Sequence, residues 1–355
     1  MISLKPRGSV RLGTLTVAAF LLLALGLAAC GGSSSNSTGS SEASTEASTE
    51  TEGSGSVEGK TATIVGCTSA IPYCAKENEV MQKGLEAEGV DVTVLIDELN
   101  AAEEAAHINQ AVAQGTDAIL WVANAQEAAH APLVKAQQAE IPVVLVGTPP
   151  GPTVEGFYTT YVGPSDVKSG ELQATMLAEG LEKAGVDSGK IMLVTGAKGA
   201  IAVNARLEGW NIAIAKMPQY EVVAEPDGGW DPVKAAQVTQ PLFAKYGNEL
   251  VGASAFSGSM AAATAQTAEQ AGLSVGTKKG DVVVAGLNCD GTSIAAVKDG
   301  TMYATTSQGP VSESEVAIRT TVELLEGKEV SDNIEVKNEP IYKSNVAQFE
   351  AECSY

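Results

Sequence analysis

The stretch between residues 108 and 147 constrains the fold of this chain more than any other. It holds two continuous apolar runs, 118–122 and 141–146, separated by an alanine-rich segment with the composition of a helix. Because parallel strands need a crossover of about ten residues or more, these two runs are expected to lie parallel in one sheet. The stretch therefore predicts a right-handed βαβ unit. Parallel sheets of this kind bind ligands at the carboxyl ends of their strands, so function is sought there.

Strands and helices alternate along the whole chain from residue 60 onwards. Short apolar or alternating segments predict strands at 60–66, 91–97, 118–122, 141–146, 157–162, 190–195, 220–225, 252–256, 282–287 and 301–307. Amphipathic segments with helix-capping or helix-ending residues predict helices at 74–89, 100–114, 165–184, 203–217, 232–246, 259–271, 293–298 and 312–326. The pattern restarts near residue 190, which predicts an α/β fold with a doubly wound sheet followed by a second lobe of similar design.

The amino-terminal residues carry an export signal. Three basic residues precede an apolar run at 15–29, which is followed directly by Cys30 in the sequence LAAC. This arrangement predicts a signal peptide over residues 1–29. The run is shorter than the ~20 residues that span a bilayer, which disfavours a retained transmembrane anchor. The LAAC sequence resembles the bacterial lipobox, so Cys30 is expected to be the lipidated first residue of a protein held at the outer face of the cell membrane.

The segment after the signal, 30–59, is rich in Ser, Thr, Glu and Gly and has almost no large apolar side chain. It cannot bury enough surface to offset the entropy of ordering, so a disordered tether is expected. The whole chain has 22 basic and 43 acidic residues, and removal of residues 1–29 takes away three basic ones, leaving a net charge of about −24. This charge disfavours binding to nucleic acid.

Four further cysteines follow the tether, at Cys67, Cys74, Cys289 and Cys353. An even number in an exported and oxidising compartment indicates disulfides, and four cysteines allow three pairings. We favour Cys67 with Cys74, which would close a short loop after the first strand, and Cys289 with Cys353, which would hold the carboxyl-terminal segment. The sequence leaves the pairing open, because a bridge requires Cα atoms within roughly 7 Å.

Catalytic motifs are absent from the sequence. It has no Gly-x-Ser-x-Gly, no Walker loop, no Gly-x-Gly-x-x-Gly and no metal-ligand spacing, and its two histidines, His107 and His130, fall on helices away from strand ends. We therefore expect no enzyme, no cofactor and no metal. The alternative is an enzyme that uses Cys74, which at a helix amino terminus would be a nucleophile if its thiol were free.

Several phrases in order resemble the type I periplasmic solute-binding proteins, specifically their ribose-binding-like branch, over residues 60–345. The phrases are Ile-Pro-Tyr-Cys at 71–74, Gly-Thr-Asp-Ala-Ile at 115–119 with Ile-Pro-Val-Val at 141–144, the segment 199–210 with Arg206 and Gly-Trp at its end, and Asp-Gly at 290–291 with Val-Lys-Asp-Gly at 297–300. The resemblance implies two Rossmann-like lobes with parallel sheets, joined by a three-segment hinge that crosses near 163–165, 306–308 and 334–336.

The same resemblance implies a domain division and a set of ligand-facing positions. The N-terminal lobe would comprise 60–164 and 308–334, and the C-terminal lobe 165–307 and 335–355. The implied ligand-binding residues are Tyr73, Cys74, Thr148, Asn204, Arg206, Trp230, Ser257, Asn288 and Gln308.

Two departures from the family pattern bear on the ligand. Gly147 and Thr148 stand where an Asp-Arg pair is usual, and Asn204 stands at the position of a sugar-clamping arginine. These changes predict a pocket of amides, hydroxyls and aromatic faces with its charged groups largely neutralised, suited to a sugar or another small neutral solute between Tyr73 and Trp230.

Some of these residues also have a purely structural interpretation. Arg206 could be an ion-pair partner near the hinge, and Asn288 and Gln308 could satisfy backbone groups at strand ends. Trp121 and Trp210 are expected in the core. The sequence does not choose between the two interpretations for Arg206, Asn288 and Gln308.

The function expected from the sequence is that of a monomeric substrate-binding lipoprotein. It would capture a small solute between its lobes and deliver it to the membrane permease of an ATP-binding-cassette (ABC) importer. The alternative within binding is a sensor that presents its ligand to a membrane kinase or chemoreceptor.

Overall fold

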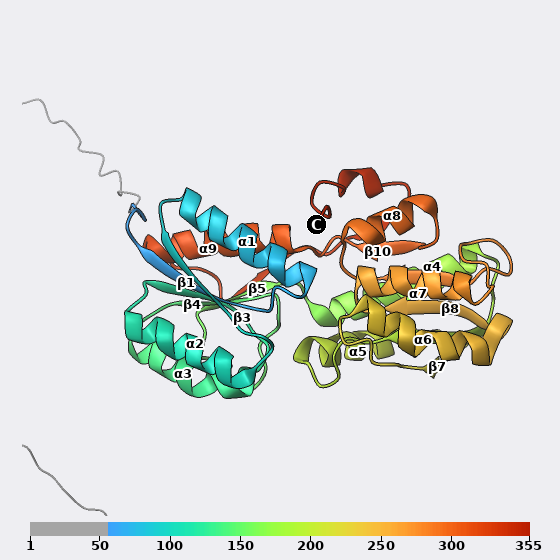
Figure 1. Ribbon diagram of the computed structural model, residues 1–355, viewed down its shortest axis with the longest axis horizontal. Helices are drawn as coiled ribbons and strands as arrows, with labels where there is room; N and C mark the ends of the chain where they lie inside the picture. Colours follow the sequence, from blue (N-terminus) through green and yellow to red (C-terminus); the bar gives the residue numbers. More distant parts are fainter. Residues whose placement is uncertain (1–55) are drawn as a thin grey trace, which may run out of the picture. The chain divides into compact units, whose positions relative to one another are not determined.

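The computed structural model describes residues 56–355 and contains two separate six-stranded sheets. The first has the order β11-β5-β4-β3-β1-β2 and the second β12-β10-β9-β8-β6-β7 (Figure 1). The strands are β1 (Thr61–Gly66), β2 (Asp91–Ile96), β3 (Ala118–Val122), β4 (Val143–Val146), β5 (Thr160–Gly163), β6 (Gly189–Val194), β7 (Tyr220–Ala224), β8 (Leu250–Ala255), β9 (Val283–Gly286), β10 (Ala304–Thr306), β11 (Asn333–Glu335) and β12 (Pro340–Tyr342). We call the part built on the first sheet the N-terminal lobe and the part built on the second the C-terminal lobe.

Helices connect the strands of each sheet. They are α1 (Pro72–Ala87), α2 (Ala101–Gln114), α3 (Gln126–Gln138), α4 (Asp166–Lys183), α5 (Ile201–Ile214), α6 (Pro232–Tyr246), α7 (Gly258–Gln270), α8 (Gly291–Asp299) and α9 (Pro310–Leu325), with short 3₁₀ turns η1 (Gly247–Glu249) and η2 (Val346–Gln348). The two α/β lobes predicted from the sequence are therefore present. Strands β3 and β4 pair in parallel, Ile119 opposite Val143, which confirms the βαβ unit.

The N-terminal sheet is buried on both faces because its central strands are apolar throughout. All five residues of β3 are buried. Helices α1 and α9 cover one face and α2 and α3 the other (Figure 1). Met81 and Ala317 belong to the cluster on the first face, and Ile108 and Leu133 to the cluster on the second.

Two elements differ from the sequence prediction. Strands β11 and β12 were not predicted, and β12 pairs antiparallel with β10 in an otherwise parallel sheet. Each has only three residues, too few to show the alternation of a strand.

Residues 56–59, which the sequence assigned to the tether, instead contact the N-terminal lobe. Val57 is buried in its core, and Gly59 donates a backbone hydrogen bond to Gly89. The signal peptide, Cys30 and the rest of the tether lie outside the described residues.

The chain passes between the two sheets three times, at 164–165, 307–309 and 336–339. Asn338 links these crossings, because its side chain accepts a hydrogen bond from the Gln308 backbone at 3.0 Å and donates one to Ser169 of α4 at 2.9 Å. The crossings thus lie close together, near the carboxyl ends of both sheets. Within residues 56–355, no helix has both the length and the apolar character needed to span a bilayer.

Candidate functional site

The loop that follows β1 is closed by a disulfide. Cys67 and Cys74 are bonded, with Cα atoms 5.5 Å apart. Pro72 begins α1, so Tyr73 and Cys74 fall in its first turn. The bond is one of the two favoured from the sequence, and it removes the free thiol on which an enzyme using Cys74 would depend.

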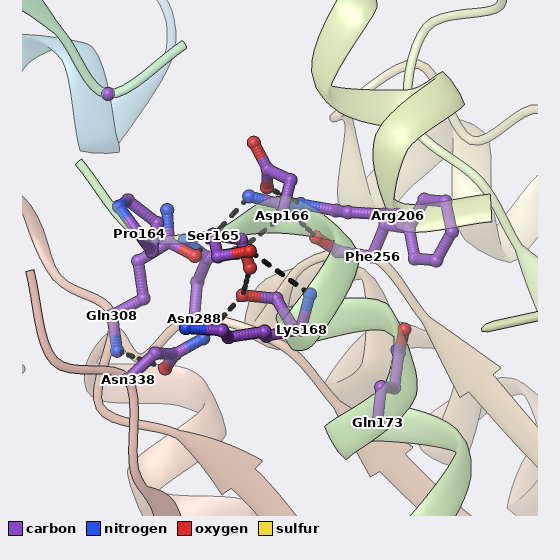
Figure 2. Close-up of polar contacts among 12 residues, drawn as sticks. Pro164, Ser165, Asp166, Lys168, Gln173, Arg206, Phe256, Asn288, Gln308 and Asn338 are labelled. Carbon is purple, nitrogen blue, oxygen red and sulfur yellow. Dashed lines mark hydrogen bonds and ion pairs between the residues drawn. The ribbon is translucent and has the colours of Figure 1, made fainter. Parts of the chain in front are cut away.

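Arg206 organises the C-terminal side of the site. Its side chain is only 5% exposed, and it donates from Nε to Asp166 at 2.6 Å and from Nη1 to the Phe256 carbonyl at 2.7 Å and to Asn288 Oδ1 at 3.1 Å. A longer contact of 3.4 Å joins Nη2 to Gln308 Oε1. Figure 2 shows these side chains converging on the guanidinium from separate elements. We call Arg206, Asp166, Asn288 and Gln308 the Arg206 cluster.

Close packing of two helices sets the position of Arg206. Gly170 of α4 and Gly209 of α5 meet so closely that a Cβ atom on Gly170 would lie 2.0 Å from the Arg206 carbonyl oxygen, and one on Gly209 would lie 1.8 Å from that of Val167. A side chain at either position would push the helices apart. The two glycines therefore hold α5 against the start of α4, where Asp166 is the first helical residue.

The Arg206–Asp166 pair is buried and charged. Burial raises the pKa of Asp166, and Arg206 opposes that rise. One carboxylate oxygen, Oδ2, has no hydrogen-bond partner among the described residues. On the other side, Trp230 lies with its ring centroid 5.4 Å from Arg206 Cζ, a cation–π distance.

The local backbone turns Trp230 toward Arg206. Trp230 adopts φ +65°, an uncommon value for a tryptophan, and its ring covers Gly196 so closely that a Cβ atom there would lie 2.2 Å from Trp230 Cζ2. Strained backbone of this kind is often found at functional sites. The glycine therefore leaves room for the ring beside the Arg206 cluster.

Two glutamates organise the N-terminal side. Glu77 lies one turn after Tyr73 on α1, and Glu313 lies in the first turn of α9. Their side chains are 1% and 0% exposed. Gln308 of the Arg206 cluster donates from Nε2 to Glu313 Oε1 at 3.0 Å. We call Glu77 and Glu313 the glutamate pair.

The free oxygens of the glutamate pair face the same place. A Cβ atom on Gly147, at the end of β4, would lie 3.1 Å from Glu313 Oε2 and 3.5 Å from Glu77 Oε1. Neither oxygen has a well-aligned hydrogen-bond partner among the described residues, and the hydroxyl of Tyr73 lies beside Glu313 without a well-aligned hydrogen bond to it. The sequence interpretation did not anticipate these two buried carboxyl groups beside Gly147, and the neutral character of the pocket stays a prediction.

Burial raises the pKa values of the glutamate pair and of Tyr73. It raises the pKa of Glu313 to about 7, and it raises that of Glu77 well above its ordinary value, with a further rise from the neighbouring Glu313. Burial also raises the pKa of Tyr73, followed by the nearby charges of Glu313 and Glu77. The pair therefore holds at least one proton at neutral pH when nothing else neutralises it.

The carboxyl-terminal segment adds an aromatic ring to the site. Cys289 and Cys353 form the second disulfide, with Cα atoms 5.3 Å apart. Tyr355 donates its hydroxyl hydrogen to the Cys289 carbonyl and packs edge-to-face on Tyr73, with ring centroids 6.2 Å apart. The second disulfide therefore places a C-terminal-lobe tyrosine against the first turn of α1.

The other predicted site residues lie at strand or helix ends with less contact. Asn204 is exposed on α5. Thr148 is half-buried after β4, and Ser257 caps α7 by accepting a hydrogen bond from the Met260 backbone at 3.3 Å. No hydrogen bond between these three and the Arg206 cluster is recorded within residues 56–355. Whether any of the nine predicted residues binds ligand stays a prediction.

The sequence interpretation missed Glu77, Glu313, Asp166 and Tyr355. The available signal was spacing, since Glu77 follows Tyr73 by one helical turn and Glu313 follows Gln308 by five residues. Nothing in that spacing indicates burial. Within the described part of the chain, no group of three or more His, Cys, Asp and Glu side chains is placed to hold a metal ion.

Comparison with known proteins gives a consistent result. A family model described as a periplasmic binding protein domain matches residues 62–329. Ribose import binding protein RbsB of Escherichia coli strain K12 is 25% identical over 270 residues, which are 76% of this chain and 86% of the relative.

Solved structures share the fold. An ABC transporter periplasmic solute-binding protein from Actinobacillus succinogenes 130z, with bound D-allose, superposes with a TM-score of 0.74 at 22% identity, covering 82% of this chain and all of the other. The periplasmic binding component of the arabinose ABC transporter from Shewanella sp. ANA-3, bound to L-arabinofuranose, gives 0.75 at 21% identity, covering 82% and 95%.

Proposed function

The chain belongs to the periplasmic binding protein family, of the ribose-binding kind, and on that premise we propose that it is the extracytoplasmic solute-binding protein of an ABC importer. One observation carries the proposal. Side chains at the carboxyl ends of both sheets form a connected polar network that runs from Arg206 through Gln308 to Glu313. Such ends are where open α/β sheets bind ligands.

The proposed ligand is a small, sugar-like polar solute. Trp230 and Tyr73 provide aromatic surfaces on opposite sides of the network, which suit the apolar faces of a sugar ring. Buried amides and carboxyls between them suit its hydroxyl groups. The relative from Escherichia coli is named for ribose import, and the Actinobacillus protein holds D-allose, which supports this ligand class.

Capture by hinge closure is part of the proposal. The three crossings at 164–165, 307–309 and 336–339 are the segments about which the lobes would rotate. Asn338 joins the crossings at 307–309 and 336–339 to the start of α4, which follows the crossing at 164–165. A rotation at one crossing would therefore be coupled to the other two. Closure would exclude water from the polar network and strengthen its hydrogen bonds to the ligand.

Delivery to a membrane permease is the remaining step. We propose that lipidation of Cys30 and the serine-rich segment after it tether a monomer to the outer face of the cell membrane, within reach of the permease. Mass spectrometry of the protein purified from membranes tests this step. We expect an acylated Cys30 at the mature amino terminus, and a Cys30→Ala variant should leave the membrane fraction. An unmodified Cys30 on a secreted protein would contradict lipid anchoring.

Isothermal titration calorimetry tests solute capture. The panel comprises pentoses, hexoses, amino sugars, polyols and nucleosides, and one class should give saturable binding with a change in tryptophan fluorescence. Trp121 and Trp210 are fully buried, so the change should arise from Trp230 and disappear in Trp230→Phe. The absence of saturable binding in every class would overturn the proposed function.

A further inference from the structure

The glutamate pair has unused hydrogen-bonding capacity that the fold itself does not explain. Glu77 and Glu313 come from two helices far apart in the sequence, are almost completely buried, and turn one oxygen each toward Gly147 without a partner. The hydroxyl of Tyr73, in the turn before Glu77, is also buried, and it lies beside Glu313 without a well-aligned hydrogen bond. Buried polar atoms without partners destabilise a fold and are uncommon in folded proteins.

Local charges do not balance. Glu77, Glu313 and Asp166 are three buried acids, and the basic group recorded beside them is Arg206. Arg206 already donates to Asp166, Phe256, Asn288 and Gln308, so little of its capacity remains for the glutamate pair. A buried carboxylate is stable only when it is paired, coordinates a cation or takes up a proton.

We propose that the glutamate pair binds a protonated amine of the solute, so that the ligand is an amino sugar or an aminated polyol. This inference rests on the proposed function, which supplies the place of the ligand between the lobes. An ammonium group has three donors, which match the free oxygens of Glu77 and Glu313 and the oxygen of Tyr73. Hydrogen bonds between an ammonium and a carboxylate are about twice as strong as neutral ones.

The proposal includes a proton balance. The ligand-free pair holds a proton near neutral pH, and the incoming ammonium takes over its role in neutralising the carboxylates. The displaced proton passes to the solvent. The titratable and charged groups that surround the pair are Tyr73, Tyr161, Asp166, Arg206 and Tyr355.

The test compares matched sugars by calorimetry. D-glucose, D-glucosamine and the uncharged N-acetyl-D-glucosamine form one set, and D-galactose with D-galactosamine another. We expect the amino sugar to bind at least tenfold more tightly than its neutral counterpart. Titrations at pH 7 in two buffers of different ionisation enthalpy should show proton release with the amino sugar alone.

Two variants and one matched control assign the effect to the pair. Glu77→Gln and Glu313→Gln keep the shape of the side chain and should abolish the tenfold preference for the amino sugar over its neutral counterpart. Glu315→Gln makes the same change two residues later on α9, where the side chain is exposed, and should keep the preference. If a variant fails to fold, the measurement of proton release by the unmodified protein still tests whether the pair binds an amine.

The outcomes separate this inference from the proposed function. Equal binding of amino and neutral sugars, or binding without proton release, would overturn the inference and leave solute capture intact. Binding of Ca²⁺ to the pair without any amine preference would also overturn it. No binding of any sugar would overturn both.

Discussion

The two sides of the site bury charge in different ways. On the C-terminal side, the Arg206 guanidinium is surrounded by acceptors from three separate segments and by a carboxylate. On the N-terminal side, Glu77 and Glu313 are equally buried, but each keeps an oxygen without a partner. Among the described residues, the C-terminal side has one free oxygen, Asp166 Oδ2, but its carboxylate is paired with Arg206, whereas neither member of the glutamate pair has a basic partner of its own. The contrast favours the structural interpretation of Arg206, and it is consistent with the binding role that we propose for the glutamate pair.

The largest expected effect on stability concerns the C-terminal side of the site, where Arg206 has several hydrogen-bond partners. Arg206→Met leaves Asp166 buried without its cation, and breaking a buried pair in this way should lower the free energy of unfolding by about 3 to 5 kcal/mol. Urea denaturation measures the loss. The double variant Asp166→Asn with Arg206→Met should recover part of it, because no uncompensated charge then remains. A loss below about 1 kcal/mol in the single variant would show that Arg206 is not structural.

The next effect is the dependence of stability on pH. The folded-state pKa of Glu313 is about 7, above the value of ~4.3 in an unfolded chain, so the native state binds the extra proton between these values. Stability is therefore highest below pH ~4.3 as far as this group is concerned and falls as pH rises toward 7, by roughly 3 kcal/mol.

Urea denaturation between pH 4.5 and 7.5 checks this slope. Glu77, Glu104 and Asp166, whose pKa values are also raised by burial, act in the same direction. Glu313→Gln should flatten the profile and Glu315→Gln should leave it unchanged. A profile for Glu313→Gln as steep as that of the unmodified protein would place the titration elsewhere.

A smaller change in stability, of opposite sign, is expected on the N-terminal side of the site. Glu77→Met removes a buried carboxyl group whose free oxygen has no partner, so the ligand-free protein should gain about 1 to 2 kcal/mol of stability. Thermal and urea unfolding measure the change. A loss of stability would mean that Glu77 has a structural partner, and the contrast between the two sides of the site would fail.

The smallest effect compares two tyrosine hydroxyls in contact. Tyr355→Phe removes a hydrogen bond to the Cys289 carbonyl and should cost about 1 kcal/mol. Tyr73→Phe removes a hydroxyl that lies beside Glu313 without a well-aligned hydrogen bond, so it should cost less than Tyr355→Phe in the ligand-free protein. Chemical denaturation of both variants gives the two values. Equal costs would show that the hydroxyl of Tyr73 is also paired.

Much of the fold was predictable because most of its strands correspond to short apolar runs that can be recognised in the local sequence. The apolar run 118–122 is bounded by Gly115 and by polar residues, and it became a fully buried strand with those same limits. Strand β11 could not be found in this way, because its three residues are held by pairing with Tyr161, Val162 and Gly163, far away in the sequence. Short strands of this kind depend on tertiary contacts rather than on their own composition.

The site was predictable only in part, for a related reason. Strand ends and glycine-flanked loops pointed to Trp230 and Gln308, and the structure joins both to Arg206. Glu77 and Glu313 are ordinary acidic residues in helices, which sequence alone places on a solvated face. Their burial follows from the packing of α1 on α9 beside Gly147, which no local pattern records.

The bond between Cys289 and Cys353 makes one wall of the site dependent on oxidation. It joins residues 64 positions apart, and closing a loop of that length contributes about 4 kcal/mol in the chain-entropy model. When it is reduced, Tyr355 keeps its place beside Tyr73 only through noncovalent contacts. In protein prepared in a reducing cytosol this wall of the site would be incompletely ordered, and affinities measured on it would differ from those of the oxidised protein.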